Sequence, residues 1–182
     1  MLDSAFIATI TLILINVGIF TLPFVIDFSK GVYSSFQEFV MLGWKDNEEV
    51  KGGEYYRLLT SIFLHADVLH LLSNMYALWI FGRSLNPLVM LPIFFVSGLV
   101  GNILSFLFNK MPSVGASGAI FGLVGYILAL SFQFPILSGS SFDLIFFVVI
   151  SFIFASIPGS KIDIYGHLGG VVAGFILGFV LK

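Results

Sequence analysis

The chain has 182 residues, of which 58% are hydrophobic and 10% are charged, and its mean hydropathy is +1.07. Soluble domains carry about 25% charged residues, so this composition excludes that class and indicates a membrane protein. The net charge of −2 provides no basic surface for nucleic acid. The absence of cysteine excludes disulfides, thiolate metal sites and a cysteine nucleophile.

Six apolar runs follow one another along the chain, each near the roughly 17–25 residues that a helix needs to span a bilayer. They cover residues 5–26, 58–81, 88–108, 116–134, 142–157 and 164–181. Lipid permits only helices or closed barrels, and runs of this length do not alternate as barrel strands do. Most of the connections are short and rich in glycine, proline, serine and asparagine, so we expect one all-α domain of six transmembrane helices over residues 1–182.

The first apolar run begins without the basic segment of a secretory signal and is longer than the apolar region of such a signal. We therefore interpret it as a retained spanning helix. Residues 27–57 follow it and contain most of the chain's charge, together with Phe36, Phe39 and Trp44. This mixture predicts an amphipathic loop that lies at the membrane interface rather than a solvated linker.

The second apolar run is polar in its first half. Asp67 precedes an apolar helical pattern as an N-cap does, and Gly82 stands where a helix would end. The sequence thus predicts a helix over 68–81, with residues 56–66 as a structured approach to it. His70 then lies in the first helical turn.

The second, fourth and sixth helices should run in the same direction across the membrane, because one return pass separates each from the next. His70 is near the start of the second, Ser117 of the fourth and His167 of the sixth. These three residues are therefore expected near the same membrane face. Ionisable groups at membrane depth are costly and usually mark a functional site.

Ser117 lies in a glycine-rich sequence, with Gly115 and Gly118 beside it and Gly122 one turn later. At a helix N-terminus, its hydroxyl would lie near unpaired N–H groups and the positive end of the helix dipole, which stabilise an oxyanion. The alternative is a packing helix whose serine is only a cap.

Glycines recur at every fourth position of the last run: Gly166, Gly170, Gly174 and Gly178. Such a ridge predicts that this helix packs closely on the fourth one. That packing would bring Ser117 and His167 within the roughly 2.6–3.2 Å that a general base needs. The alternative for His167 is a hydrogen-bonded structural histidine.

His70 and Asn74 are four residues apart and share one face of the predicted helix. Both side chains carry hydrogen-bond donors that could point to one place, as an oxyanion hole requires, although interhelical hydrogen bonds would explain them equally. His65 lies five residues before His70, and we expect it to face elsewhere and to hold the preceding loop in place.

Three patterns formed by these residues resemble those of the rhomboid family of intramembrane serine proteases, over nearly the whole chain. They are GxSGxxxG at 115–122, HxxxxHxxxN at 65–74 and HxxGxxxG at 167–174. Their order along the chain and their placement on three helices of the same direction make the resemblance specific. The six-helix core of the family also matches the number of apolar runs, with no seventh helix.

The resemblance implies a dyad of Ser117 and His167 without a third acidic residue, in which the serine attacks a peptide carbonyl and the histidine transfers the proton. It implies an oxyanion hole made by the Ser117 backbone N–H with the side chains of His70 and Asn74. The substrates would be membrane proteins, cut in or near a transmembrane helix, and no metal or organic cofactor is implied. Residues 27–57 resemble the family's first loop, which dips into the outer leaflet.

Two positions depart from the family pattern. Tyr56 and Arg57 stand where the first loop usually ends in Trp-Arg, and we expect Arg57 to keep its role of bracing the loop. Phe121 stands where a tyrosine often packs on the catalytic histidine. We therefore expect the Phe121 ring to contact the histidine without supplying a hydroxyl, which should alter the tuning of the histidine rather than abolish activity.

The orientation implied by the resemblance places both termini in the cytoplasm and opens the active site to the extracytoplasmic side of what we expect to be the cell membrane. The basic residues oppose this orientation, because cytoplasmic loops usually carry the excess of lysine and arginine (the positive-inside rule), whereas here only Arg83 and Lys182 would be internal. The external ones would be Lys30, Lys45, Lys51, Arg57, Lys110 and Lys161. Several of these lie in a long loop that is also rich in acidic residues, where the positive-inside rule is weaker. We therefore expect the orientation that the motifs imply.

Two other functions stay open on the residues alone. A bis-histidine haem protein would use His70 and His167 as axial ligands, but it would leave Ser117 and Asn74 unexplained. A catalytically inactive relative of the rhomboid family would bind membrane clients without cutting them, although such relatives usually lack the serine or the histidine. The natural substrate and the oligomeric state cannot be read from the sequence.

Overall fold

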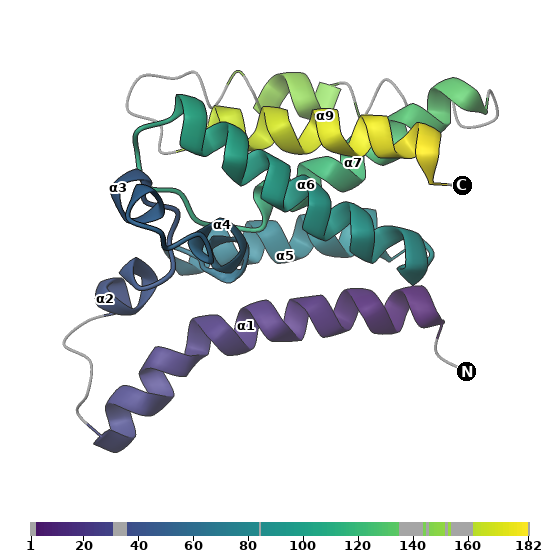
Figure 1. Cartoon of the computed structure of the whole chain (residues 1–182). Coiled ribbons are helices and arrows are strands. Elements are labelled where there is room, and N and C mark those ends of the chain that lie inside the picture. Colours follow the sequence, from purple (N-terminus) through teal and green to yellow (C-terminus); the bar gives the residue numbers. More distant parts are fainter. Residues whose placement is uncertain are drawn as a thin grey trace.

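A computed structural model describes residues 3–30, 36–83, 85–134, 144, 146–151, 153 and 162–181. Over these residues the chain is built from helices, which confirms the predicted all-α class (Figure 1). Two helical spans, Ser4–Val25 and Pro87–Phe108, are long and apolar enough to cross a membrane, and a third results if 57–63 and 68–82 form one bent span. Of the predicted fifth helix, 142–157, the structure describes residues 144, 146–151 and 153, which are helical, and the rest of this prediction lies outside the described residues.

Helix α1 (Ser4–Lys30) is longer than predicted, because nothing after residue 26 stops it. The prediction that the first loop begins at residue 27 is therefore wrong. Pro23 lies inside α1, where it removes a backbone hydrogen bond, and the second half of the helix bends away from the other helices (Figure 1). The first half lies along α5, with Phe6 packed edge-on against Trp79 at 5.6 Å.

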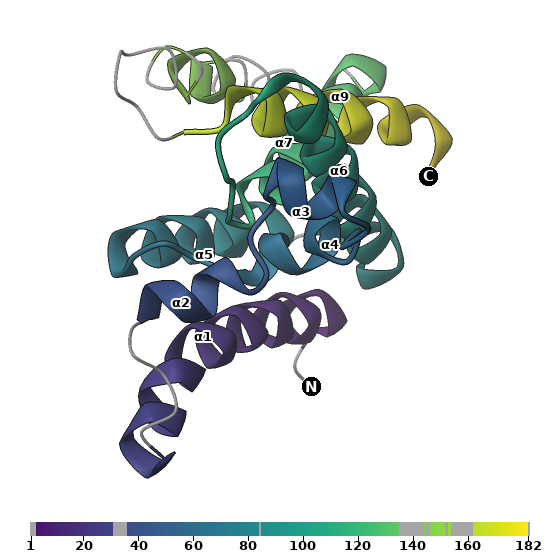
Figure 2. The same cartoon turned by 60° about the vertical axis from the view of Figure 1, so that its left-hand side comes forward.

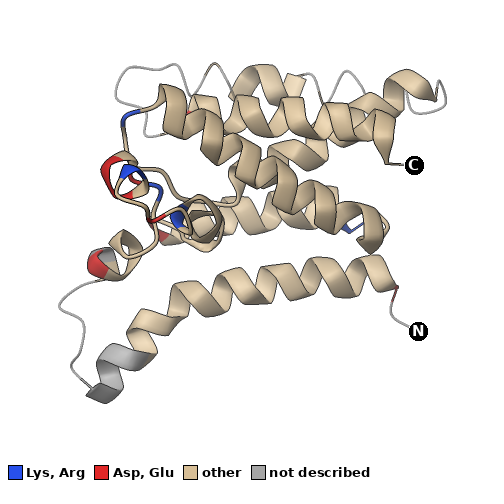
Figure 3. Cartoon of the chain, viewed as in Figure 1, with Lys and Arg blue, Asp and Glu red and all other residues tan. Residues whose placement is uncertain are grey.

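The first loop contains three short helices, α2 (Phe36–Met41), α3 (Asn47–Lys51) and α4 (Arg57–Thr60), and α4 continues into the 3-10 helix η1 (Ser61–Phe63). Most of the charged residues drawn in Figure 3 gather here, at one end of the molecule. Val40 and Val50 are buried beneath this charged surface. The loop is thus packed against the helices, as an amphipathic segment would be.

Helix α5 (Val68–Gly82) begins where predicted, because the Asp67 carboxylate accepts a hydrogen bond from the His70 backbone N–H at 2.8 Å. The segment 57–63 meets α5 at 89°, which confirms that a separate structured approach precedes it. The helix ends at Gly82, one residue later than the predicted bound of 81, and Arg83 is its C-cap. A Cβ at Gly82 would lie 3.0 Å from Thr9 Oγ1, so the glycine allows α1 to pack closely.

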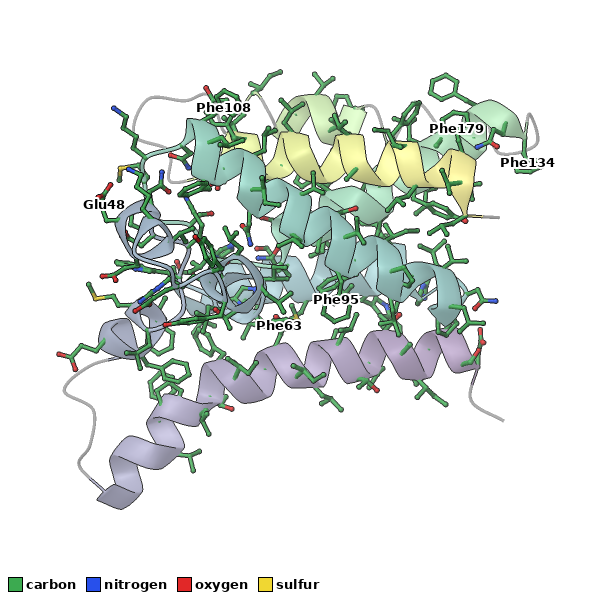
Figure 4. All side chains as sticks on the ribbon, in the orientation of Figure 1. Glu48, Phe63, Phe95, Phe108, Phe134 and Phe179 are labelled. Atoms are coloured by element: carbon green, nitrogen blue, oxygen red, sulfur yellow. The ribbon has the colours of Figure 1, made fainter. Side chains whose placement is uncertain are left out.

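Helices α6 (Pro87–Phe108), α7 (Ser117–Gln133) and α9 (Ile164–Val180) follow, close to the predicted bounds. These three pack tightly on one another, while α1 lies beside α5 and apart from α9 in both views (Figures 1 and 2). Large apolar side chains cover the outside of this group. Among those labelled in Figure 4, Phe108 is 60% exposed and both Phe134 and Phe179 are 49% exposed, as suits a surface in contact with lipid.

Candidate active site

Ser117 is the first residue of α7, and the backbone before it is held in a tight conformation. Gly115 has a φ of +121°, a region that side chains other than glycine rarely adopt, and its N–H donates to the Ser61 carbonyl at 2.9 Å. The residue in the N-cap position is Ala116, and no side chain caps the helix there. The alternative in which Ser117 is only a helix cap is therefore wrong.

His167 is in the first turn of α9 and faces α7. Its Nε2 lies 2.9 Å from Ser117 Oγ, which is within the spacing predicted from the glycine pattern. The imidazole is only 8% exposed. Asp163 fixes the start of this helix, because its carboxylate accepts from the Gly166 N–H at 3.1 Å and its carbonyl accepts from the His167 N–H at 3.1 Å.

The contact between α7 and α9 is made largely by backbone atoms. A Cβ at Gly170 would overlap the carbonyl oxygen of Gly118, and a Cβ at Gly174 would overlap that of Gly122. The predicted close packing of these two helices is therefore confirmed. Gly166 differs from the rest of the ridge, because its Cβ position faces the Asp163 carboxylate of its own helix cap rather than α7.

His70 and Asn74 approach Ser117 from α5. A Cβ at Gly115 would lie 2.7 Å from His70 Nε2 and 3.5 Å from Asn74 Nδ2, so both side chains converge on the backbone two residues before Ser117. Asn74 Nδ2 donates to the His70 carbonyl at 3.0 Å. An amide nitrogen carries two N–H groups, and this bond uses one of them.

Further aromatic rings lie beside the imidazoles of His70 and His167. His65 is buried and its ring lies 5.1 Å from that of His70, so the prediction that it faces elsewhere is wrong. His65 lies in the connection between η1 and α5, which is the loop that it was expected to hold in place. Phe121 stacks on His167 with ring centroids 4.2 Å apart, as expected for the family's aromatic position. The ring of Phe147 in turn stacks on that of Phe121, with centroids 5.5 Å apart.

Arg57 braces the first loop as predicted. Its Nη1 donates to the carbonyls of Met41 at 2.7 Å and Trp44 at 3.3 Å, and its Nε pairs with Glu54 at 2.6 Å. The guanidinium also lies over the Tyr56 ring, 5.7 Å from its centroid. Hydrogen bonds from Tyr56 and Arg57 hold the pKa of the Glu54 carboxyl below its ordinary value.

Two polar residues near the site were not singled out from the sequence. Asp163 stands directly before the apolar run 164–181, and an aspartate in that position is a signal for the N-cap that it forms. Lys45 was counted as one of several loop charges, yet it is fully buried. Nothing in the local sequence indicates that burial, because two of its three hydrogen-bond acceptors lie more than 60 residues away.

The arrangement provides a hydroxyl beside an imidazole and places both against a helix N-terminus with polar side chains nearby. A hydroxyl becomes a nucleophile when a neighbouring base accepts its proton. Helix N-termini and amide or imidazole N–H groups stabilise the negative charge that develops on an attacked carbonyl. These are the parts of a site for acyl transfer.

Comparison with known proteins agrees with this geometry. The family model described as the rhomboid domain matches residues 52–182. Rhomboid protease GluP of Bacillus subtilis (strain 168) is 38% identical over 152 residues, which cover 80% of this chain and 30% of GluP. RHOMBOID-like protein 6, mitochondrial, of Arabidopsis thaliana is 36% identical over 157 residues, covering 81% of this chain and 50% of that protein.

Putative rhomboid protease YdcA of Bacillus subtilis (strain 168) is 33% identical over 149 residues, which are 75% of each chain. The chain thus spans half or less of the length of GluP and RHOMBOID-like protein 6, and three quarters of the length of YdcA. The matched region contains α4 to α9 and with them every residue of the site. The chain is an integral membrane protein and belongs to the rhomboid family.

Proposed function

We propose that the protein is an intramembrane serine protease that hydrolyses peptide bonds in or near the transmembrane helices of other membrane proteins. The observation that supports this most directly is the 2.9 Å separation of Ser117 Oγ and His167 Nε2 at the N-termini of two apolar helices. A pair at this distance transfers a proton without rearrangement. The rhomboid family membership supports the same reaction class.

The reaction proceeds in two halves. Ser117 Oγ attacks the scissile carbonyl carbon while its proton moves to His167 Nε2, and the new C–O bond leaves a negative charge on the carbonyl oxygen. The Ser117 N–H and the side chains of His70 and Asn74 stabilise that oxyanion. The C–N bond then breaks as His167 returns the proton to the leaving amine, and water hydrolyses the acyl-enzyme by the reverse route.

Phe121 gives the imidazole a fixed ring plane during these transfers. Its ring covers one face of His167 at 4.2 Å, and Phe147 holds Phe121 from behind. A base that transfers protons in both directions needs one orientation, because a displacement on the order of 1 Å lowers rates about 100-fold. The stack with Phe121 supports this orientation.

We further propose that six transmembrane helices form one domain over residues 1–182, in a cell membrane, with the site open to the extracytoplasmic side. The starts of α5, α7 and α9 lie toward the end of the molecule where the charged first loop gathers (Figure 3), and Arg83 directly follows the last residue of α5. The chain contains no cysteine, so one introduced at the exposed Lys110 reports the orientation. A membrane-impermeant maleimide should label Lys110→Cys in intact cells and should not label Arg83→Cys.

The geometry does not favour the two alternative functions. An axial haem ligand needs a ring nitrogen directed at iron, whereas His167 Nε2 is directed at Ser117 Oγ and one face of the ring is covered by Phe121. An inactive client-binding relative would not need the serine and histidine at this distance. One labelling experiment distinguishes the active protease from the haem protein and from the inactive relative.

The protein in detergent or liposomes is incubated with a fluorophosphonate probe and, separately, with a membrane-protein substrate that carries one transmembrane helix. The wild type should be labelled and should cleave, Ser117→Ala should do neither, and His167→Ala should lose nearly all cleavage. Ser117→Ala should still insert and fold, since among the described residues the hydrogen bond of Oγ is the one with His167. Cleavage by Ser117→Ala at the wild-type rate would exclude the dyad, and a strong Soret absorption would favour the haem protein.

A further inference from the structure

Lys45 of the first loop is fully buried, and every N–H of its ammonium group has an acceptor. Nζ donates to Asn47 Oδ1 at 3.1 Å and to the backbone carbonyls of Asn109 at 3.2 Å and Met111 at 2.8 Å. An ammonium carries three donors, so this set is complete. Burying a cation is costly unless it is fully hydrogen-bonded, and a fully satisfied one fixes the groups around it.

The two carbonyl acceptors of Lys45, those of Asn109 and Met111, lie in the segment that leads from α6 to Ser117. The backbone holds the same segment, because the Lys45 N–H donates to the Ser113 carbonyl at 2.9 Å and the Ser113 N–H donates back at 3.0 Å. Asn47 adds a third connection, with Nδ2 donating to the Asn109 carbonyl at 3.1 Å. The first loop thus holds residues 109–113, which end four residues before the nucleophile.

The other side of this segment holds the start of α9. The Asp163 carboxylate accepts a hydrogen bond from Ser105 of α6 and interacts with the side chains of Ser113 and Asn109. The same carboxylate caps α9 through Gly166, three residues after it. Burial lowers the pKa of the Lys45 ammonium, and the nearby charges of Asp163 and Asp46 offset part of this shift.

We propose that Lys45 is a positioning residue for the dyad, acting through residues 109–113 on Ser117 at one end and through Asp163 on His167 at the other. This inference rests on the proposed protease function. It assigns to the first loop a part in the chemistry, because the loop supplies the cation that sets the relative position of α7 and α9 at the depth of the dyad. Lys45 itself does not touch the reacting atoms.

Removing the cation should displace the segment rather than unfold the protein. Lys45→Met keeps the length of the side chain but leaves the Met111 carbonyl without its hydrogen bond from Nζ. Because a displacement of about 1 Å at a catalytic group lowers rates on the order of 100-fold, we expect kcat to fall about 10-fold to 100-fold. KM should change less than threefold, since no substrate contact is removed.

The experiment compares Lys45→Met with Lys51→Met, which makes the same change six residues later on the same loop. The Lys51 side chain is 60% exposed and pairs with Glu48 along α3, so its replacement should leave kcat unchanged. Lys45→Arg, which keeps the charge and the donors, should recover part of the lost kcat. The second-order rate of fluorophosphonate labelling should follow kcat through the series, because it reports the reactivity of Ser117 without a protein substrate.

A second comparison tests the route through Asp163. If Lys45 acts on the same segment as Asp163, the fold losses of Lys45→Met and Asp163→Asn will not multiply, and the double variant will be no slower than about the slower single variant. Losses that multiply would overturn the route. All assays are run well below the unfolding midpoint of each variant, and Lys45→Gln replaces Lys45→Met if the latter does not fold.

Unchanged kcat and labelling in folded Lys45→Met would overturn the proposal, as would a loss confined to KM. A loss of kcat in Lys45→Met that Lys45→Arg does not reduce would also overturn it, because the size of the buried side chain would then matter rather than its charge. Failure of the protease function itself would show differently, since the wild type would neither label nor cleave.

Discussion

Replacing Gly170 by alanine adds one methyl group at the point where α9 touches α7. The new Cβ would overlap the carbonyl oxygen of Gly118, which follows the nucleophile directly. A carbon and a carbonyl oxygen ordinarily stay about 3.3–3.6 Å apart, so the two helices must separate by roughly 1 Å. The obstacle is backbone, and no side chain can rotate to relieve it.

This separation acts directly on the 2.9 Å between Ser117 Oγ and His167 Nε2. A misplacement of about 1 Å costs on the order of 100-fold in rate, and overpacking costs about 1–3 kcal/mol of stability. We therefore expect Gly170→Ala to lower kcat about 100-fold and to lower the thermal unfolding midpoint. The assay is the initial rate of cleavage of a transmembrane substrate in liposomes, with the midpoint measured on the same sample.

The matched control is Gly18→Ala, which makes the same change in α1, where an added Cβ meets nothing within 4 Å. Its rate and midpoint should equal those of the wild type or exceed them slightly, because alanine favours a helix by about 1 kcal/mol over glycine. A Gly170→Ala protein that cleaves as fast as Gly18→Ala would refute the reasoning that backbone contact between α7 and α9 sets the dyad.

Two further predictions concern the proposed oxyanion hole and the first loop. Asn74→Ala should lower kcat by up to about 10²–10³ without abolishing it, because it removes one proposed oxyanion donor, and a rate as low as that of Ser117→Ala would contradict this role. For Glu54, whose pKa is lowered from 4.5 by hydrogen bonds from Tyr56 and Arg57, the stabilising effect is present above that pH and is lost as the pH falls below it. The unfolding midpoint of the wild type should therefore fall more steeply with acidification than that of Glu54→Gln, and parallel curves would rule out this contribution.

Local signals in the sequence predicted most of the described helices. Asp67 marked the start of α5 because an N-cap side chain acts on the N–H three residues later, as it does on His70. The repeated glycines of α9 indicated its partner because only a smooth face allows two backbones to touch. In the same way, the direction of the helices predicted that Ser117 and His167 lie at one end.

Features that depend on distant parts of the chain could not be predicted in this way. The burial of Lys45 depends on the carbonyls of Asn109 and Met111, which carry no mark in the sequence. The contact between His65 and His70 arises from the 89° turn between η1 and α5, and residue spacing along one helix does not apply across such a turn. Helix α1 passed its expected end because a charged residue alone does not stop a helix.

The glycine contacts between α7 and α9 also determine how the site should respond to its surroundings. Where side chains lie between helices, changes in rotamer let the helices slide and rotate by small amounts. At Gly118 and Gly170 there are no rotamers to change, so the two helices should tilt as one unit when the bilayer becomes thicker or thinner. The geometry of proton transfer would then be the same in membranes of different thickness, and lipid composition would act on substrate entry instead.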